Sequence, residues 1–317
     1  MKKERMKRNV LTGRRVTVAL LLAYFASTGF SQAKNGFDLS NAVVPENEII
    51  LGGPPRDGIP SIDNPKFIPA SAVTYLKDDD IVIGLVEGGQ AQAYPHRILI
   101  WHEVVNDTFA GESVMVTYCP LCGTGMVFSR EIKGKERTFG VSGLLYQSDV
   151  LMYDRESESL WSQLGMKAIS GPHVGTQLKW LRSEHMTWKA WRQKYPESQV
   201  LSTETGYQRD YGGSAYNSYF KSEKTMFPVP HTRKELPNKE WVIGVIINGQ
   251  ASAYPISDLP SGDELTDTVG GETISVSYNA KRKHPVVTGS EGRHIPSVLV
   301  FWFAWQAFYP ETELWRP

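Results

Sequence analysis

SVMVTYCPLCGTGMVFSR, residues 113–130, holds both cysteines of the chain between two strand-like runs. Valine and tyrosine alternate before the cysteines, and β-branched and aromatic residues resume after them, which predicts a strand-turn-strand unit. The Pro-Leu-Cys-Gly-Thr-Gly between the runs is typical of a turn and is a poor helix start. Cys119 and Cys122 therefore lie together at the end of a hairpin. Their spacing resembles a metal-binding knuckle, which supplies half of a tetrahedral site.

An internal repeat surrounds this hairpin. IVIGLVEGGQAQAYPHRIL at 81–99 recurs as WVIGVIINGQASAYPISDL at 241–259, and the ungapped alignment, continued over 48 pairs, contains 17 identities at an offset of 160. Further on, TWKAWRQKYPES at 187–198 recurs as FWFAWQAFYPET at 301–312. Chance would give roughly three identities in the first alignment. The chain is therefore interpreted as a tandem duplication whose second copy lacks about fifty residues between these landmarks.

The second copy separates scaffold residues from candidate functional ones. It keeps Gly, Gln, Tyr-Pro and Asp positions of the first copy, but where the first has His102, Cys119 and Cys122 it has Gly262, Asn279 and Arg282. The joint loss of one histidine and two cysteines predicts that these three residues form one functional unit.

The first 33 residues read as an export signal. A basic region precedes an apolar stretch and a small-x-small cleavage site, Ser31-Gln32-Ala33, and an uncleaved anchor is the alternative. The segment holds 7 of the 34 basic residues and 1 of the 34 acidic residues of the chain. The remainder therefore has 27 basic and 33 acidic residues and a net charge of −6. We expect a periplasmic or secreted protein without stable membrane insertion after cleavage. An acidic chain is a poor nucleic-acid binder, so a small molecule or a redox protein is the expected partner.

Three kinds of chemistry suit the cysteine pair. Two thiolates with the His102 imidazole would bind copper or zinc and leave a position open, as in an oxidoreductase. Alternatively, Cys119 and Cys122 are the catalytic pair of a thiol-disulfide oxidoreductase, with a neighbouring histidine lowering a thiol pKa. A structural disulfide in a non-catalytic binding module is the third hypothesis.

Residues 139–163 fall in the segment that the second copy lacks, and their polar and aromatic character predicts a pocket wall beside the cysteines. Tyr153 and Asp154 are the candidate catalytic residues in this segment, with Asp154 or Asp149 as the acid/base group and Met152 as a soft metal ligand. The alternative is a hairpin in which Asp154 caps a turn and Trp161 lies in the core. The remaining expected pocket residues are Tyr146, Asp149, Met152, Trp161 and Gln163.

Four motifs in order resemble one prokaryotic family, known as domain of unknown function 3179. They are WHEVVND (101–107), TYCPLCGTG (117–125), SGLLYQSDVLMYDRESESLWSQ (142–163) and the W-x-x-W-x-x-x-Y-P segment. The resemblance covers roughly residues 68–205. It implies no reaction, but it marks as motif positions His102, Cys119, Cys122, Tyr153, Asp154, Trp161 and Gln163.

The expected fold is α+β, mainly antiparallel β with a few short helices, because the Trp/Tyr segments read as amphipathic helices packed on sheets. The expected organisation has a signal (1–33), an irregular arm (34–69) and a first repeat with the Cys/His motifs (70–205). A linker (206–240) and a shortened second repeat (241–317) follow.

Overall fold

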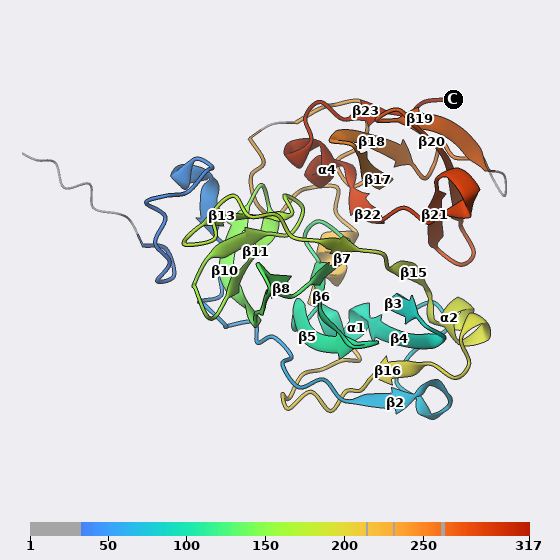
Figure 1. Cartoon of the computed structure of the whole chain (residues 1–317), viewed down its shortest axis with the longest axis horizontal. Coiled ribbons are helices and arrows are strands. Elements are labelled where there is room, and N and C mark those ends of the chain that lie inside the picture. The colour runs from blue at the N-terminus through green and yellow to red at the C-terminus, as the bar shows by residue number, and fades with distance from the viewer. Residues whose placement is uncertain (1–32, 214, 231, 261–263) are drawn as a thin grey trace, which may run out of the picture. The chain divides into compact units, whose positions relative to one another are not determined.

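The computed structural model describes residues 33–213, 215–230, 232–260 and 264–317. Strands account for 41% of it and helices for 11%, and five small sheets are arranged as a five-bladed β-propeller (Figure 1). The prediction of an α+β fold is therefore wrong, because the longest segments expected to be helical form helices of only seven residues. Apart from Ala33, the expected export signal lies outside the described residues.

The first copy forms two sheets. One has the strand order β14 (Trp180–Leu181), β7 (Thr124–Ser129), β6 (Glu112–Cys119), β5 (Val104–Phe109). The other has the order β15 (Glu184–Thr187), β3 (Ile81–Glu87), β4 (Gln90–Pro95), β16 (Gln199–Leu201), β2 (Phe67–Pro69).

The second copy forms two equivalent sheets. One is β22 (Ser297–Phe301), β17 (Trp241–Ile247), β18 (Gln250–Pro255), β23 (Glu313–Leu314), and the other is β19 (Leu265–Val269), β20 (Glu272–Asn279), β21 (His284–Thr288).

The fifth sheet comes from the segment that the second copy lacks. Its order is β1 (Ile49–Leu51), β10 (Phe139–Tyr146), β11 (Asp149–Asp154), β12 (Leu160–Ser162), β13 (Lys167–Ser170). A small hairpin, β8 (Glu131–Ile132) and β9 (Lys135–Glu136), leads into it. We call this five-stranded sheet the inserted sheet. Strands β1 and β2 belong to the segment expected to be an irregular arm, so that arm contributes an edge strand to two sheets.

The helices are short. They are α1 (His96–Leu99), α2 (Trp188–Lys194), α3 (Asn217–Phe220) and α4 (Trp302–Phe308), with 3₁₀ turns η1 (Glu46–Glu48), η2 (Ala70–Ala72) and η3 (Ser290–Gly292). None of the helices in the described part of the chain has the length and apolar character needed to cross a membrane.

The two copies repeat each other's packing in detail. Helix α2 places Trp191 so close to Gly84 that a Cβ there would lie 1.8 Å from the indole, and α4 places Trp305 on Gly244, where the distance would be 2.4 Å. Each indole nitrogen donates a hydrogen bond to a hydroxyl seven residues on, at 2.8 and 2.9 Å. Both glycines are therefore required by the close approach of a tryptophan.

The copies also exchange backbone hydrogen bonds with each other. The Thr187 amide donates to the Arg282 carbonyl at 2.8 Å, and the Phe301 amide donates to the Cys122 carbonyl at 2.9 Å. Residues 187 and 301 are equivalent, as are 122 and 282, so the two bonds are related by the repeat. The first repeat and the second are thus joined about a pseudo-twofold axis, and the cysteine turn contributes to this junction.

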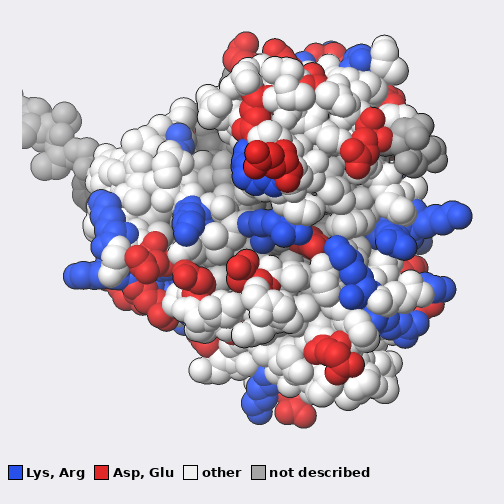
Figure 2. Space-filling model, turned by 45° about the vertical axis from the view of Figure 1, so that its right-hand side comes forward, with Lys and Arg blue, Asp and Glu red and all other residues white. Residues whose placement is uncertain are grey.

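Charged side chains of both signs are interspersed on the face of the molecule that Figure 2 shows, with wide uncharged areas between them. Among the described residues on this face, no field of a single sign extends over several elements.

Candidate functional site

The cysteine turn joins β6 to β7. Cys119 is the last residue of β6 and pairs with Thr124, the first residue of β7. Both thiols are free and buried, with exposed fractions of 1% for Cys119 and 0% for Cys122. Gly123 has φ +70°, and a Cβ there would meet the Trp241 ring at 2.5 Å, so the second copy covers one side of the turn. The sequence correctly predicts the strand-turn-strand unit here.

The inserted sheet covers the other side. Tyr146 and Asp149 pair across the β10–β11 hairpin, and the two residues between them, Gln147 and Ser148, have φ values of 52° and 66°. Two left-handed residues in a two-residue loop are the pattern of a type I′ turn, which fixes the register of the hairpin. The hairpin end therefore projects to the cysteines, where the Cys122 thiol donates to the Ser148 carbonyl at 3.3 Å.

This hairpin also delivers a carboxylate. The two Sγ atoms and one carboxylate oxygen of Asp149 all lie within 4.8 Å of one another, and all three residues are buried. The Leu164 amide donates to Asp149 Oδ2 at 2.9 Å, whereas Oδ1 receives no hydrogen bond of normal geometry within the described residues. Thiolate and carboxylate are both zinc ligands, so the group could hold a metal ion.

Burial sets the protonation of the site. It raises the pKa of both thiols, and it raises the pKa of Asp149 to about 7, against the opposing effect of the Leu164 hydrogen bond. Glu103, next to the turn in space, has its pKa raised to about 8, first by burial and then by the charge of Asp149. Four acidic groups thus share one buried place; the two thiols and Glu103 hold their protons at pH 7, whereas Asp149 titrates near that pH.

Ionisation of these clustered side chains is unfavourable unless a cation binds among them. The groups that act most strongly on the two thiols are the thiols themselves, Asp149 and, for Cys119, Glu103, all of which become negative on ionisation. A metal ion would replace the protons and compensate the charge of the deprotonated ligands. Perturbed titratable groups that converge in one place are also a signature of functional sites.

His102 does not join the thiols. Its ring is fully buried, and both nitrogens have other partners, with Nδ1 2.8 Å from the Pro60 carbonyl oxygen and Nε2 2.7 Å from the Tyr211 hydroxyl. The expected set of His102, Cys119 and Cys122 is therefore not assembled, and Asp149 occupies the place next to the thiols. The sequence predicts Asp149 as a pocket-wall or acid/base residue but not as a partner of the thiols, since no spacing rule connects a hairpin in the inserted sheet to the cysteine turn.

Three other predicted pocket residues surround the site without facing a cavity. The Gln163 side chain donates to Thr117 Oγ1 and accepts from Thr124 Oγ1, each at 2.7 Å, and so links β6, β7 and the inserted sheet. Met152 and Trp161 are fully buried in the same apolar cluster as the cysteines. Their role is to fix the inserted sheet against the turn.

Tyr146, Tyr153 and Asp154 have their contacts elsewhere. Tyr146 packs edge-on against Phe308, with ring centroids 5.6 Å apart. The Tyr153 hydroxyl donates to Asp57. Five residues of strand separate Asp149 from Asp154, a span of about 16 Å.

Among the described residues, the hydrogen bonds of the Asp154 side chain stabilise a turn and hold a buried tryptophan. Asp154 accepts from the Ser157 amide at 2.8 Å, the Ser157 hydroxyl at 2.7 Å and the Trp161 indole at 2.8 Å. This is the turn-capping arrangement that was the alternative to an acid/base role, and the structure places neither Tyr153 nor Asp154 in the thiol cluster.

The sequence profile of a family described as Protein of unknown function (DUF3179) matches residues 56–295. This match confirms the resemblance found from the four motifs. Comparisons with curated proteins and with solved structures give no match.

Proposed function

Since the chain belongs to the DUF3179 family, whose description names no activity, we propose its function from the site itself: it binds one zinc ion through Cys119, Cys122 and Asp149. The observation that carries the proposal is the convergence of two sulfur atoms and a carboxylate oxygen within 4.8 Å in a buried place. Hydrogen bonds between Asp149 and both thiols support it, because they hold the three groups together and a metal ion would take the place of the thiol protons.

The ligand types favour zinc over copper. Cu(I) prefers thiolates and thioethers, whereas zinc accepts thiolate and carboxylate together. Met152, the other soft donor of the region, packs in the apolar cluster. We therefore place zinc before copper.

Charge balance argues that Glu103 stays outside the ligand set. Zinc with two thiolates and one carboxylate has a net charge of −1, and a second carboxylate would make it −2 in a buried place. Burial raises the pKa of Glu103 to about 8 in the metal-free protein, which disfavours a second charged carboxylate in this place. Three protein ligands then leave one position for water or a small-molecule substrate, as in catalytic rather than structural zinc sites.

The thiol-disulfide alternative has less support. A reactive cysteine is partly exposed and has a lowered pKa, whereas both thiols here are buried and their pKa values are raised. We also propose that the protein is exported to the periplasm or secreted, and this part of the proposal depends only on the signal-like sequence of residues 1–33. The substrate would be a small molecule that reaches the open position.

Metal content and free-thiol count, measured together on protein purified without chelator, test the proposal. We expect about one zinc per chain and two thiols that react after denaturation. Cys119→Ser, Cys122→Ser and Asp149→Asn should each lose the metal. Asp154→Asn is the matched control, since Asp154 is an equally buried carboxylate on the same strand, and His102→Gln tests the histidine; both should keep the metal.

Two results would reject the metal site. Protein without metal and without free thiols would mean that the pair forms a disulfide. Protein without metal but with two free thiols would favour thiol-disulfide chemistry. The reduction potential of the Cys119/Cys122 pair would then distinguish an enzyme from a binding module.

A further inference from the structure

A cavity of about 370 Å³ lies at the junction of the two copies and borders the cysteine turn through Tyr118 and Gly123. Ten of its lining residues are five pairs related by the repeat, at the offset of 160 for four pairs and of 114, the offset of the Trp/Tyr segments, for the fifth. Three of these pairs are Tyr118 with Tyr278, His96 with Ile256, and His185 with Leu299. The cavity therefore lies on the pseudo-twofold axis, and each copy supplies one half of its wall.

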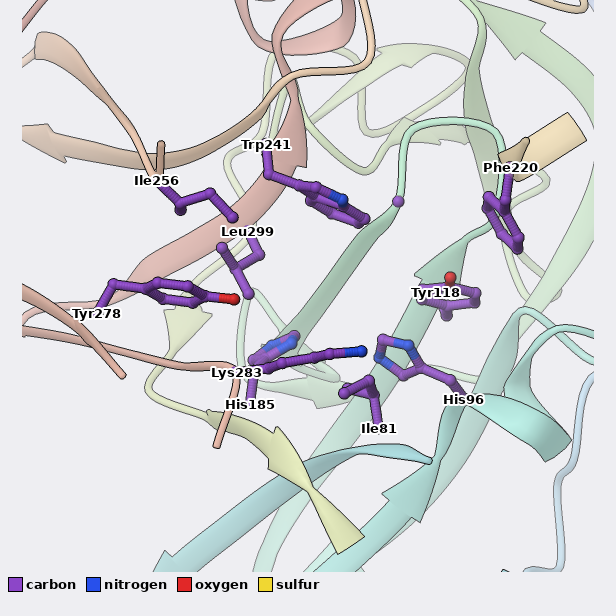
Figure 3. A pocket seen from close by; sticks show the side chains of 11 residues that line it. Ile81, His96, Tyr118, His185, Phe220, Trp241, Ile256, Tyr278, Lys283 and Leu299 are labelled. Carbon is purple, nitrogen blue, oxygen red and sulfur yellow. The ribbon is translucent and has the colours of Figure 1, made fainter. Parts of the chain in front are cut away.

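The two halves differ in chemistry. The first copy contributes two histidines where the second contributes Ile256 and Leu299. Figure 3 shows His96, His185 and the Lys283 side chain grouped on one side, with Trp241 and Leu299 across from them. The imidazole centroids are 6.1 Å apart with ring planes at 76°. The charged and imidazole groups thus gather on one side of a mainly apolar cavity, with the histidines from the first copy and Lys283 from the second.

Both histidines have an unused nitrogen. The Nε2 atoms of His96 and His185 are buried and have no hydrogen-bond partner within the described residues. Burial lowers the pKa of His185 to about 4 and that of His96 well below its usual value, so both rings are neutral near pH 7. The other nitrogen of His185 bonds to the Gly125 backbone, in the direction that raises its pKa. That bond places the proton on Nδ1 and leaves a lone pair on Nε2.

An unpartnered acceptor of this kind suits a ligand that donates a hydrogen bond. A metal ion is less suitable, because in the described part of the chain the only group of three or more metal-ligating side chains is that of Cys119, Cys122 and Asp149. The walls are aromatic and aliphatic, with Trp241, Phe220 and two tyrosines among them. The volume falls within the range of small-molecule sites. Lys283 is exposed at the rim and supplies a cation beside the histidines.

We propose that this cavity binds a small aromatic molecule with a hydroxyl group, of the phenol class. Its O–H donates to the Nε2 of His185 or His96, its oxygen accepts from the Lys283 ammonium, and its ring packs against Trp241 and Leu299. The groups proposed to bind the ligand are distinct from the metal ligands, although Tyr118 and Gly123 of the cavity wall adjoin Cys119 and Cys122 in the chain.

Titration calorimetry with phenol, and with anisole as the control ligand, tests the proposal on the whole protein. Anisole keeps the ring and the oxygen but has no hydroxyl proton. We expect phenol to bind at least tenfold more tightly than anisole. In ¹⁵N spectra of the histidine side chains, phenol should shift the Nε2 resonance of His185 or His96.

The second copy supplies the matched variant. His96→Ile with His185→Leu places the residues of the second copy in the first and makes the cavity wall apolar on both sides. Phenol affinity should fall to that of anisole, while the thermal midpoint should stay the same or rise because two unsatisfied buried nitrogens are removed. Equal binding of phenol and anisole to the natural protein, or unchanged phenol binding by the double variant, would overturn the proposal. If the variant does not fold, the histidine resonances of the natural protein decide alone, and unshifted Nε2 signals would count against it.

Discussion

In the first copy the turn between β6 and β7 is buried and carries two thiols, whereas the equivalent turn between β20 and β21 is exposed and carries Asn279 and Arg282. The two turns join equivalent pairs of strands. In each turn the carbonyl at the position of the second cysteine, Cys122 or Arg282, accepts a hydrogen bond from the opposite copy. In the second copy the Asn279 side chain accepts from the Arg282 amide at 3.0 Å. The scaffold alone therefore tolerates polar residues at both positions.

The inserted sheet accounts for the difference. It covers the first turn with Met152, Trp161 and Leu164, and its hairpin brings Asp149 to the thiols. Among the described residues, no such sheet covers the turn of the second copy. A duplicated scaffold thus acquires a candidate metal centre where extra chain buries one turn, while the common framework remains the same in both copies.

The largest effect is expected where the copies are most alike. Trp191→Ala and Trp305→Ala each remove a fully buried indole packed on a glycine, and each should lower the free energy of unfolding by about 3–5 kcal/mol. Urea denaturation of the two variants measures the effect. A loss in one variant that is several-fold smaller than in the other would show that the two copies do not stabilise the molecule equivalently.

Metal removal should have the next largest effect, and it should act through the first copy only. A ligand that binds the folded state stabilises it by about 4 kcal/mol at a free concentration of 1,000 times its Kd. We therefore expect the thermal midpoint to fall after zinc is removed with chelator and to recover when zinc is restored. Asp149→Asn should abolish the response, whereas Asp154→Asn should retain it, and a chelator-insensitive midpoint in the natural protein would contradict the zinc assignment.

The histidines of the central cavity predict a loss of stability in acid. The pKa of His185 is about 4 in the folded protein against 6.5 for an ordinary histidine, so below pH 6.5 the unfolded chain takes up the proton first. Stability is thus fully present above pH 6.5 and falls as the pH drops towards 4, by about 3 kcal/mol for this group. His96 and His284 face His185 and have lowered pKa values too, and Lys283 and Glu184 are the charged groups near these rings.

His185→Leu isolates this contribution. Urea denaturation at pH 5, 6 and 7 should show that the slope of unfolding free energy against pH near pH 5 decreases by about 1.4 kcal/mol per pH unit, the value for one proton. Leucine is the residue of the second copy at this position, so the variant makes the two halves of the cavity alike. An unchanged slope would mean that His185 is protonated in the folded state as readily as in the unfolded chain.

Much of the framework could be predicted from the sequence. Alternating β-branched residues and the repeat offsets identify most central strands, and the W-x-x-W spacing identifies two helices because the indoles must meet glycines on neighbouring strands. The fold class was wrong because those helices are too short to form a layer of their own. Local pattern predicts where a helix lies better than how far it extends.

The candidate site was less predictable. The pairing of Cys119 with Cys122 depends on local spacing, and the sequence shows it. The approach of Asp149 depends on how the inserted sheet packs, which no spacing encodes. The contacts of His102 depend on packing in the same way: its absence from the second copy predicts joint function with the cysteines. In the structure it instead links the Pro60 carbonyl to Tyr211, a contact that also belongs to the first copy alone.

The smallest effect is expected from placing the cysteine pair in the second copy. Asn279→Cys with Arg282→Cys puts the same spacing on an exposed turn, where surface substitutions change stability by about 0.5 kcal/mol or less. Under reducing conditions this variant should bind a second zinc ion more weakly than the first, because its turn is exposed and the ligand beside it is His284, which pairs with Asn279, in place of a buried carboxylate. Metal analysis against the natural protein measures it, with urea denaturation to check the fold. A second zinc bound as tightly as the first would mean that the turn alone makes the site, and the inserted sheet would then serve only to bury it.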